Sequence, residues 1–303
     1  LYNNLYNLFQ IKHLESKILI TLIELKRKIC FIKDENDHST LDMRIAYSTC
    51  MNRYMMILFM QDRILDATNI FIEYVQYNNS IPVSLYAYKY QSMMGEWFLD
   101  YARGISSEHP RIAEIFLKES VKLLENGKNK KRYVLAKMDL AFLRCVYFEK
   151  YDEIENIHVL TIILRNNNYI NEYFRGIIRE NLCKLVQYSS NLDIKNSKGI
   201  IEIAQKMKEE ALNAELDAML YISGRLAYQT RMYFAILDTI TQNYARAKKC
   251  LEQNLHMVAQ AGASFKNITL HNLKYYKDAK KVEWNSKENY SSLHSFVLDT
   301  RIW

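Results

Sequence analysis

The sequence predicts an all-α protein in which antiparallel helical hairpins stack into a superhelix. Glycine and proline are scarce, with 7 Gly and 2 Pro in 303 residues, whereas β-sandwiches and doubly wound folds need many such turn residues. Apolar residues recur with the helical period almost from end to end, separated by short polar breaks. A hydrophobic share of 49% and a charged share of 25% are typical of a folded globular chain.

The apolar periodicity places the helices one by one. In chain order they are expected over 6–32, 41–60, 64–77, 85–103, 111–126, 133–148, 153–165, 169–188, 198–211, 214–239 and 244–261. Pro110 stands just before the fifth helix, where proline is tolerated. Gly127 and Gly262 stand where a C-terminal cap is expected.

Every second helix begins after a loosely regular interval, of about 36–48 residues, which is the range of helical-hairpin arrays. A single hairpin cannot bury both of its apolar faces, so stacked neighbours must cover them. We therefore expect hairpin repeats over 41–262, an N-terminal helix or linker over 1–40, and a capping helix and tail over 263–303. The chain begins at Leu1 rather than at Met, and we expect a further N-terminal part of the protein before it.

Two stretches carry a family resemblance. In "RMYFAILDTITQNYARAKKCLEQNLHMVAQ", Ala235 and Ala247 are twelve residues apart and Leu251 follows. This spacing resembles the tetratricopeptide repeat (TPR), in which a small residue of the first helix meets a small residue of the second. Asp238 departs from the pattern, because an aromatic residue is expected there. The irregular repeat length and the long first helices also depart, so the resemblance is to degenerate, TPR-like arrays.

The second stretch, "HPRIAEIFLKESVKLLENG", offers Ala113, Leu117 and Ser120. These residues resemble the small–large–small series of the second TPR helix. The resemblance implies a right-handed α-solenoid whose first helices line a concave groove for a peptide or protein. Such a solenoid is similar to the helical domains of peptide-responsive bacterial transcription regulators and to the sensor arms of STAND-type NTPases. The implied role is the sensory or regulatory part of a larger protein, with ligand-biased closure of the superhelix.

The candidate groove residues are aromatic, basic or amide side chains on the expected first helices. They are Tyr86, Tyr90, Trp97, Lys137, Arg144, Arg175, Arg179, Arg225 and Gln229. An outward-facing, solubilising position is the alternative for each of them.

The C-terminal stretch "NYSSLHSFVLDTRIW" has no helical period but remains apolar and aromatic. Trp284, Phe296 and Trp303 are its main candidate contact residues. The last repeat of an array leaves an apolar face that must be covered. We expect the tail to cap that face; docking on another chain, a homodimer partner included, is the alternative.

Several kinds of chemistry are not expected from this sequence. It contains no phosphate loop, GxGxxG, GxSxG or HExxH motif, so we expect no nucleotide or other cofactor. Two ExxH spacings, at Glu35–His38 and Glu155–His158, lack partner carboxylates, and we expect no metal site. We expect the chain not to be an enzyme.

The cysteines, the hydropathy and the net charge indicate the cellular compartment and the kinds of partner to expect. The 5 cysteines are scattered without a CxxC pair, which is typical of free thiols in a reducing compartment. No stretch approaches the length of an apolar membrane span. We therefore expect a cytoplasmic protein without a membrane partner. The net charge of +7 is spread among interleaved acids, so we do not expect nucleic acid to bind this chain itself.

Two alternative functions remain open from the sequence. The chain could be a structural scaffold with a constitutive partner in a multi-protein complex. It could also be a helical ribonuclease, because Arg103 and His109 in "RGISSEH" are six residues apart. That spacing resembles the active-site element of HEPN-type ribonucleases, although the polar residue that usually follows the Arg is missing.

Overall fold

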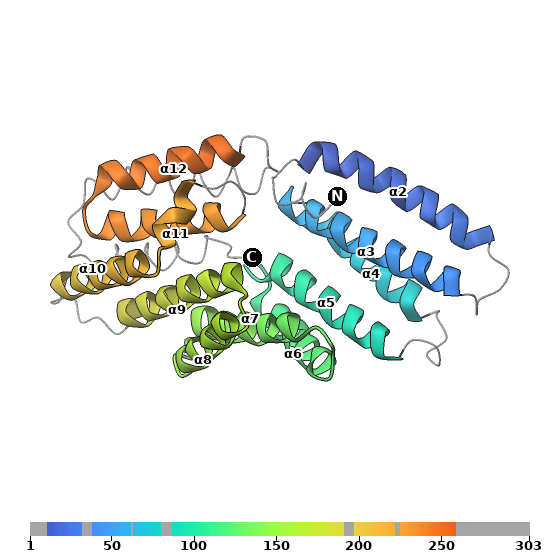
Figure 1. The fold of residues 1–303 in the computed structure, drawn as a ribbon, viewed down its shortest axis with the longest axis horizontal. Coiled ribbons are helices and arrows are strands. Elements are labelled where there is room, and N and C mark those ends of the chain that lie inside the picture. Colours follow the sequence, from blue (N-terminus) through green and yellow to red (C-terminus); the bar gives the residue numbers. More distant parts are fainter. Residues whose placement is uncertain are drawn as a thin grey trace. The chain divides into compact units, whose positions relative to one another are not determined.

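The structure is a computed structural model that describes residues 11–31, 38–61, 63–79, 87–190, 197–221 and 225–258. Every regular element in these ranges is helical, as the sequence predicted (Figure 1). The chain forms two compact units, whose described parts run from Ile11 to Tyr133 and from Val134 to Val258. Among the described helices, none combines the length and apolar character that a membrane span requires.

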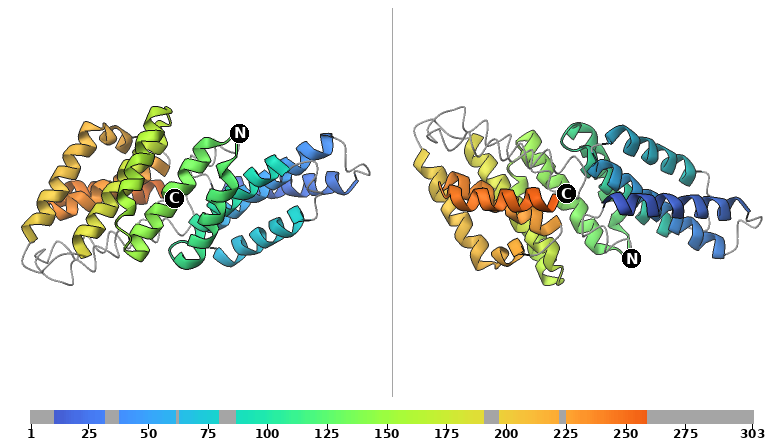
Figure 2. Two further views of the ribbon diagram at one scale, coloured as in Figure 1. Left: turned by 90° about the horizontal axis from the view of Figure 1, so that it is seen from below. Right: turned by 90° about the horizontal axis from the view of Figure 1, so that it is seen from above.

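The first unit is built on α5. Its helices are α2 (Ile11–Phe31), α3 (His38–Met60), α4 (Ile64–Asn79), α5 (Ala87–Ile105) and α6 (Pro110–Glu125), and it also includes the first turn of α7 (Lys130–Phe148). Helix α3 packs against α2 and α4, and α5 packs against α3, α4 and α6 (Figure 2). Consecutive helices therefore lie side by side, as expected for hairpins.

An aromatic cluster forms the centre of the first unit. Tyr74 of α4 stacks on Trp97 of α5, with ring centroids 3.6 Å apart. Phe71 stacks on Tyr101 at 4.0 Å, and Phe116 of α6 meets Phe71 edge to face at 5.3 Å. Three helices are thus joined by side chains that bury large apolar areas.

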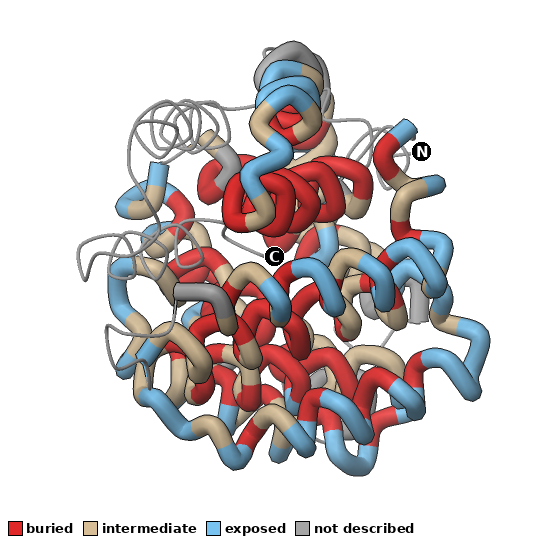
Figure 3. Tube along the Cα trace, turned by 90° about the vertical axis from the view of Figure 1, so that its left-hand side faces the viewer, coloured by how far each residue is buried: buried red, intermediate tan, exposed pale blue. Residues whose placement is uncertain are grey.

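The second unit is built around α11. It contains the rest of α7, α8 (Glu153–Asn166), α9 (Ile170–Ser190), α10 (Ser197–Asn213), a 3₁₀ helix (η2, Leu216–Tyr221), α11 (Arg225–Ile240) and α12 (Tyr244–Val258). Helix α11 packs against α9, α10, η2 and α12. Every residue from Ala227 to Ile240 is buried, and Figure 3 shows buried residues in red where helices face one another.

One predicted helix is wrong. The sequence pattern suggested a continuous helix over 214–239, but the structure has a short 3₁₀ helix over Leu216–Tyr221 and a separate α11 from Arg225. Glu215 adopts a left-handed backbone conformation with φ 59°, which an α-helix interior does not accommodate. Leu216 and Leu220 are both buried nonetheless, so the apolar spacing carried no sign of the break.

Helix ends also differ from the expected glycine caps. Gly127 follows α6, but its backbone is not in the left-handed region, and Gly262 lies outside the described residues. Asn168 and Gln242 take that conformation instead, with φ 58° and 61°. The amides after them, in Tyr169 and Asn243, bond to carbonyls five residues back, as in a Schellman cap.

Candidate ligand-binding surface

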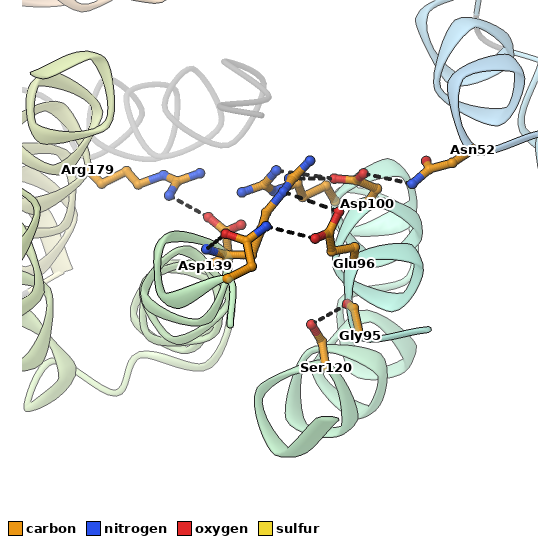
Figure 4. Close-up of polar contacts among 10 residues, drawn as sticks. Asn52, Gly95, Glu96, Asp100, Ser120, Asp139 and Arg179 are labelled. Atoms are coloured by element: carbon orange, nitrogen blue, oxygen red, sulfur yellow. Dashed lines mark hydrogen bonds and ion pairs between the residues drawn. The ribbon is translucent and has the colours of Figure 1, made fainter. Parts of the chain in front are cut away.

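The buried carboxylate of Asp100 on α5 is the centre of a polar cluster in the first unit (Figure 4). The side-chain amide of Asn52 on α3 donates to its Oδ2 at 3.2 Å. The guanidinium groups of Arg103 and Arg132 each donate from Nη1 to its Oδ1 at 3.3 Å. Helices α3 and α5 and the first turn of α7 therefore meet at one carboxylate.

Positive charge controls the ionisation of Asp100. Burial by itself raises the pKa of a carboxyl group. Arg132, Arg103 and Arg53 outweigh this effect, together with the hydrogen bond from Asn52, and the pKa of Asp100 is lowered. Asp100 is thus held as an anion among arginines.

A second set of contacts surrounds the carboxylate of Glu96, one turn before Asp100. The Asn129 side chain donates from Nδ2 to Glu96 Oε1 at 2.8 Å, and Arg132 Nε lies 3.8 Å from Oε2. Asn129 Oδ1 also accepts the backbone N–H of Arg132 at 3.3 Å. Asn129 therefore caps the N-terminus of α7 and connects it to α5.

The second unit contains a similar buried contact between first helices. Asp139 of α7 forms an ion pair with Arg179 of α9, and both side chains are buried. Two residues further along α9, Asn181 Nδ2 donates to the Tyr233 hydroxyl of α11 at 2.8 Å. Burial raises the pKa of Tyr233, so this hydroxyl stays protonated.

A third aspartate, Asp238 of α11, joins α10 to α12. Its carboxylate lies 2.6 Å from Lys208 Nζ and 3.2 Å from Arg246 Nε. Burial raises the pKa of Asp238, and these two cations offset the effect only in part. The aspartate that breaks the TPR pattern thus has a packing role, because it links three helices.

The opposite pKa shifts of Asp100 and Asp238 predict opposite pH dependences. A lowered folded pKa contributes stability above the unfolded pKa, and this contribution disappears as the pH falls through the folded value. A raised folded pKa has the reverse effect, because the folded state takes up the proton first. The stability advantage of wild type over Asp100→Asn should therefore shrink below about pH 4. The stability of wild type relative to Asp238→Asn should instead improve as the pH falls from 7.

Urea titrations of wild type and the two Asn variants between pH 7 and pH 3 measure both trends. Only the difference in free energy of unfolding between each variant and wild type is compared, so that the contributions of other titrating groups cancel. Parallel pH profiles for wild type and Asp238→Asn would show that Asp238 titrates at its ordinary value. A constant difference between wild type and Asp100→Asn at low pH would contradict the prediction for Asp100.

The sequence analysis did not name Asp100 or Asp139 and noted Asp238 only as a departure from the repeat pattern, although the three aspartates share a recognisable signal. Each interrupts an apolar helical run, in "FLDYA" (Asp100), "KMDLA" (Asp139) and "ILDTI" (Asp238). A charged residue in the buried stripe of a helix needs a partner. The repeated pattern could therefore have indicated internal ion pairs.

Three of the predicted groove residues are buried. Trp97, Arg179 and Gln229 are 2%, 1% and 4% exposed. Trp97 belongs to the aromatic cluster, Arg179 pairs with Asp139, and Gln229 lies in the buried run of α11. Their side chains are packed inside their units, so we do not carry them forward as ligand contacts.

The other predicted residues fall into two groups. Lys137 is exposed on α7, Arg144 is half-buried and bonds to Glu153 at 2.7 Å, and Arg175 is half-buried on α9. The second group consists of residues whose side chains lie outside the described part of the structure. The side chains of Tyr90 and Arg225 lie outside the described residues, as do Tyr86, Trp284, Phe296 and Trp303.

The residues of the ribonuclease alternative have different surroundings. Arg103 is largely buried and pairs with Asp100 at 3.3 Å. His109 is exposed at the N-cap of α6, where its side chain makes no capping hydrogen bond. Within the described part of the chain, no group of three His, Cys, Asp or Glu side chains is arranged to hold a metal ion.

No family model matches the chain, and neither the curated proteins nor the solved structures compared with it contain a match.

Proposed function

We propose that this chain is a peptide- or protein-binding helical-repeat domain of the TPR-like type and the sensory or regulatory part of a larger protein. The observation that carries the proposal is a contact that recurs between successive first helices. Asp100 of α5 pairs with Arg132 of α7, and Asp139 of α7 pairs with Arg179 of α9. In a hairpin array the first helices form one wall, and such contacts fix their spacing.

Close helix crossings support the hairpin part of this proposal. Ser120 of α6 donates to the Gly95 carbonyl of α5 at 2.6 Å, and a Cβ on Gly95 would come within 2.7 Å of Leu124. Gly176 of α9 likewise approaches Thr161 of α8 too closely for any side chain. Small residues therefore set the distance between paired helices, as in the repeat that the sequence resembles.

The residues of the resemblance are also buried where the proposal needs them. Ala235 of α11, Ala247 of α12 and Leu251 are each 0% exposed, in two helices that pack together. Ala113 and Leu117 of α6 are buried as well. These positions support a repeat packed through small residues.

Native mass spectrometry tests the proposed function on the chain isolated gently from the cells that make it. The expected result is an exchangeable adduct of peptide mass, or a protein partner that dissociates on dilution. The matched control is the same chain unfolded in denaturant and refolded, which should have lost the adduct. Addition of the recovered peptide to the refolded chain should restore it.

Two results would contradict the proposal. A partner that is stoichiometric and never exchanges would make the chain a structural scaffold. Cleavage of RNA by the bare chain, abolished by Arg103→Ala and by His109→Ala without loss of helicity, would establish the ribonuclease alternative. Circular dichroism of both variants is the control for folding.

A further inference from the structure

The outward side of α8, in the second unit, carries a row of exposed aliphatic side chains. Val159, Ile162 and Ile163 are 47%, 43% and 38% exposed. Residues three and four positions apart lie on one face of a helix, so these side chains are neighbours. Ile157 and Leu164 are buried on the other side, where α8 packs on α9. Helix α8 is therefore apolar on two faces, and only one of them is covered within the described part of the chain.

Exposed aliphatic residues are more scattered on the other helices. In the described ranges, no helix other than α8 has more than two large apolar side chains that are exposed. On α4, for example, the exposed polar residue Asn69 lies between Leu65 and Ile72 on the same face. Isolated apolar side chains are normal on a protein surface, whereas a contiguous group marks an interaction site. The row on α8 is thus a candidate docking surface.

A charged side chain flanks this row at each end. Glu155 is exposed in the first turn of α8, and Arg165 is exposed in the last turn. Neither forms an ion pair with a described residue, although the buried Glu153 of the same helix pairs with Arg144. The guanidinium of Arg165 lies over the Tyr173 ring of α9, 5.6 Å from its centroid. One helix face therefore presents an unpaired acid, an apolar row and an unpaired base in that order.

We propose that this face of α8 docks on the same face of a second copy of this chain, with the two α8 helices antiparallel. When the twofold axis is level with residue 160, Glu155 of each copy lies opposite Arg165 of the other. Val159 and Ile162 of the two copies then interdigitate between these charged pairs. Each contact is made twice, as in isologous dimers. The acidic N-terminus of each helix also adjoins the basic C-terminus of the other, which suits the helix dipoles.

The charges favour a second copy in this orientation over other occupants. A parallel arrangement would place Glu155 against Glu155 and Arg165 against Arg165, and like charges oppose such a contact. A partner that is only apolar would leave both charges unpaired, whereas a second α8 pairs both of them. Helix α8 is not one of the first helices to which the ligand groove is assigned, so this inference is independent of the proposed function.

Sedimentation velocity of the full chain tests the dimer. Helix α8 has 14 residues and is about 21 Å long, so the interface is small and the dimer should be weak. Wild type should shift from monomer to dimer between about 1 and 300 μM, the range of weak complexes. Ile162→Glu should raise the dissociation constant about tenfold or more. Ile72→Glu, at a comparably exposed site of α4, is the matched control and should dimerise as wild type does.

Charge reversal provides a test that non-specific apolar association does not pass. Glu155→Arg and Arg165→Glu should each raise the dissociation constant about tenfold, because both symmetry-related contacts change from attraction to repulsion. An equimolar mixture of the two variants should form a heterodimer with an affinity near that of the wild-type dimer. In the mixture each copy supplies the charge that the other needs. The double variant Glu155→Arg/Arg165→Glu should regain the homodimer for the same reason.

Each result decides the inference. Wild type that remains monomeric at every concentration, or a dimer that Ile162→Glu leaves intact, would overturn the docking of α8. A dimer that is weakened by Ile162→Glu but by neither charge reversal would overturn the antiparallel arrangement. Far-ultraviolet circular dichroism of every variant is the control for folding. A second copy doubles the mass in native mass spectrometry, so the dimer is not confused with the ligand of the proposed function.

Discussion

Replacing Arg179 by methionine should lower the free energy of unfolding of the second unit by about 3–5 kcal/mol. Arg179 and Asp139 are both buried, and their ion pair joins α7 to α9. The guanidinium also lies over the Phe142 ring, 5.8 Å from its centroid. Removal of the cation leaves the buried carboxylate of Asp139 without this ion pair. Urea denaturation followed by circular dichroism measures the loss.

A double variant separates the loss of the pair from the cost of the stranded charge. Arg179→Met/Asp139→Leu should recover most of the lost stability, because a buried pair replaced by apolar side chains of similar volume is often neutral. Lys137 is exposed on α7, the helix of Asp139. Lys137→Met is the matched control and should change the free energy of unfolding by less than about 0.5 kcal/mol. An Arg179→Met variant as stable as the control would contradict the prediction.

The helices could be predicted from the sequence because apolar residues recur along each run and the runs end near polar breaks. Helix α8, expected over 153–165, was found over Glu153–Asn166. The helix predicted over 214–239 was wrong because Leu216 and Leu220 keep an α-helical spacing through a 3₁₀ turn. Periodicity reports which residues are buried, and it does not report a single left-handed residue such as Glu215.

The site was harder to predict than the fold. Arg175 and Arg179 are one helical turn apart and were both predicted to line the groove, yet only Arg179 is buried. Its partner Asp139 lies forty residues earlier in the chain, and one sequence contains no signal for such a pairing. Asn52 was missed for the same reason, because its role depends on Asp100 of another helix.

Truncation of Trp97 to alanine should destabilise the first unit by about 3–5 kcal/mol. Its indole is 2% exposed and stacks on Tyr74, so the substitution opens a cavity between α4 and α5. Phe71 is the other aromatic neighbour, with ring centroids 6.4 Å apart. Urea denaturation monitored by far-ultraviolet circular dichroism gives the change without relying on tryptophan fluorescence.

A second substitution decides whether Trp97 only packs in the core or also lines the predicted groove. Trp97→Phe keeps a ring against Tyr74 and should cost roughly half as much as the alanine variant. If Trp97 only packs, Trp97→Phe should bind the peptide recovered in native mass spectrometry as wild type does under conditions where both are folded. If Trp97 lines the groove, as its sequence context predicted, Trp97→Phe should weaken binding while its stability stays close to wild type. The burial of the indole favours the first outcome, because a side chain enclosed between two helices can reach a ligand only if those helices separate.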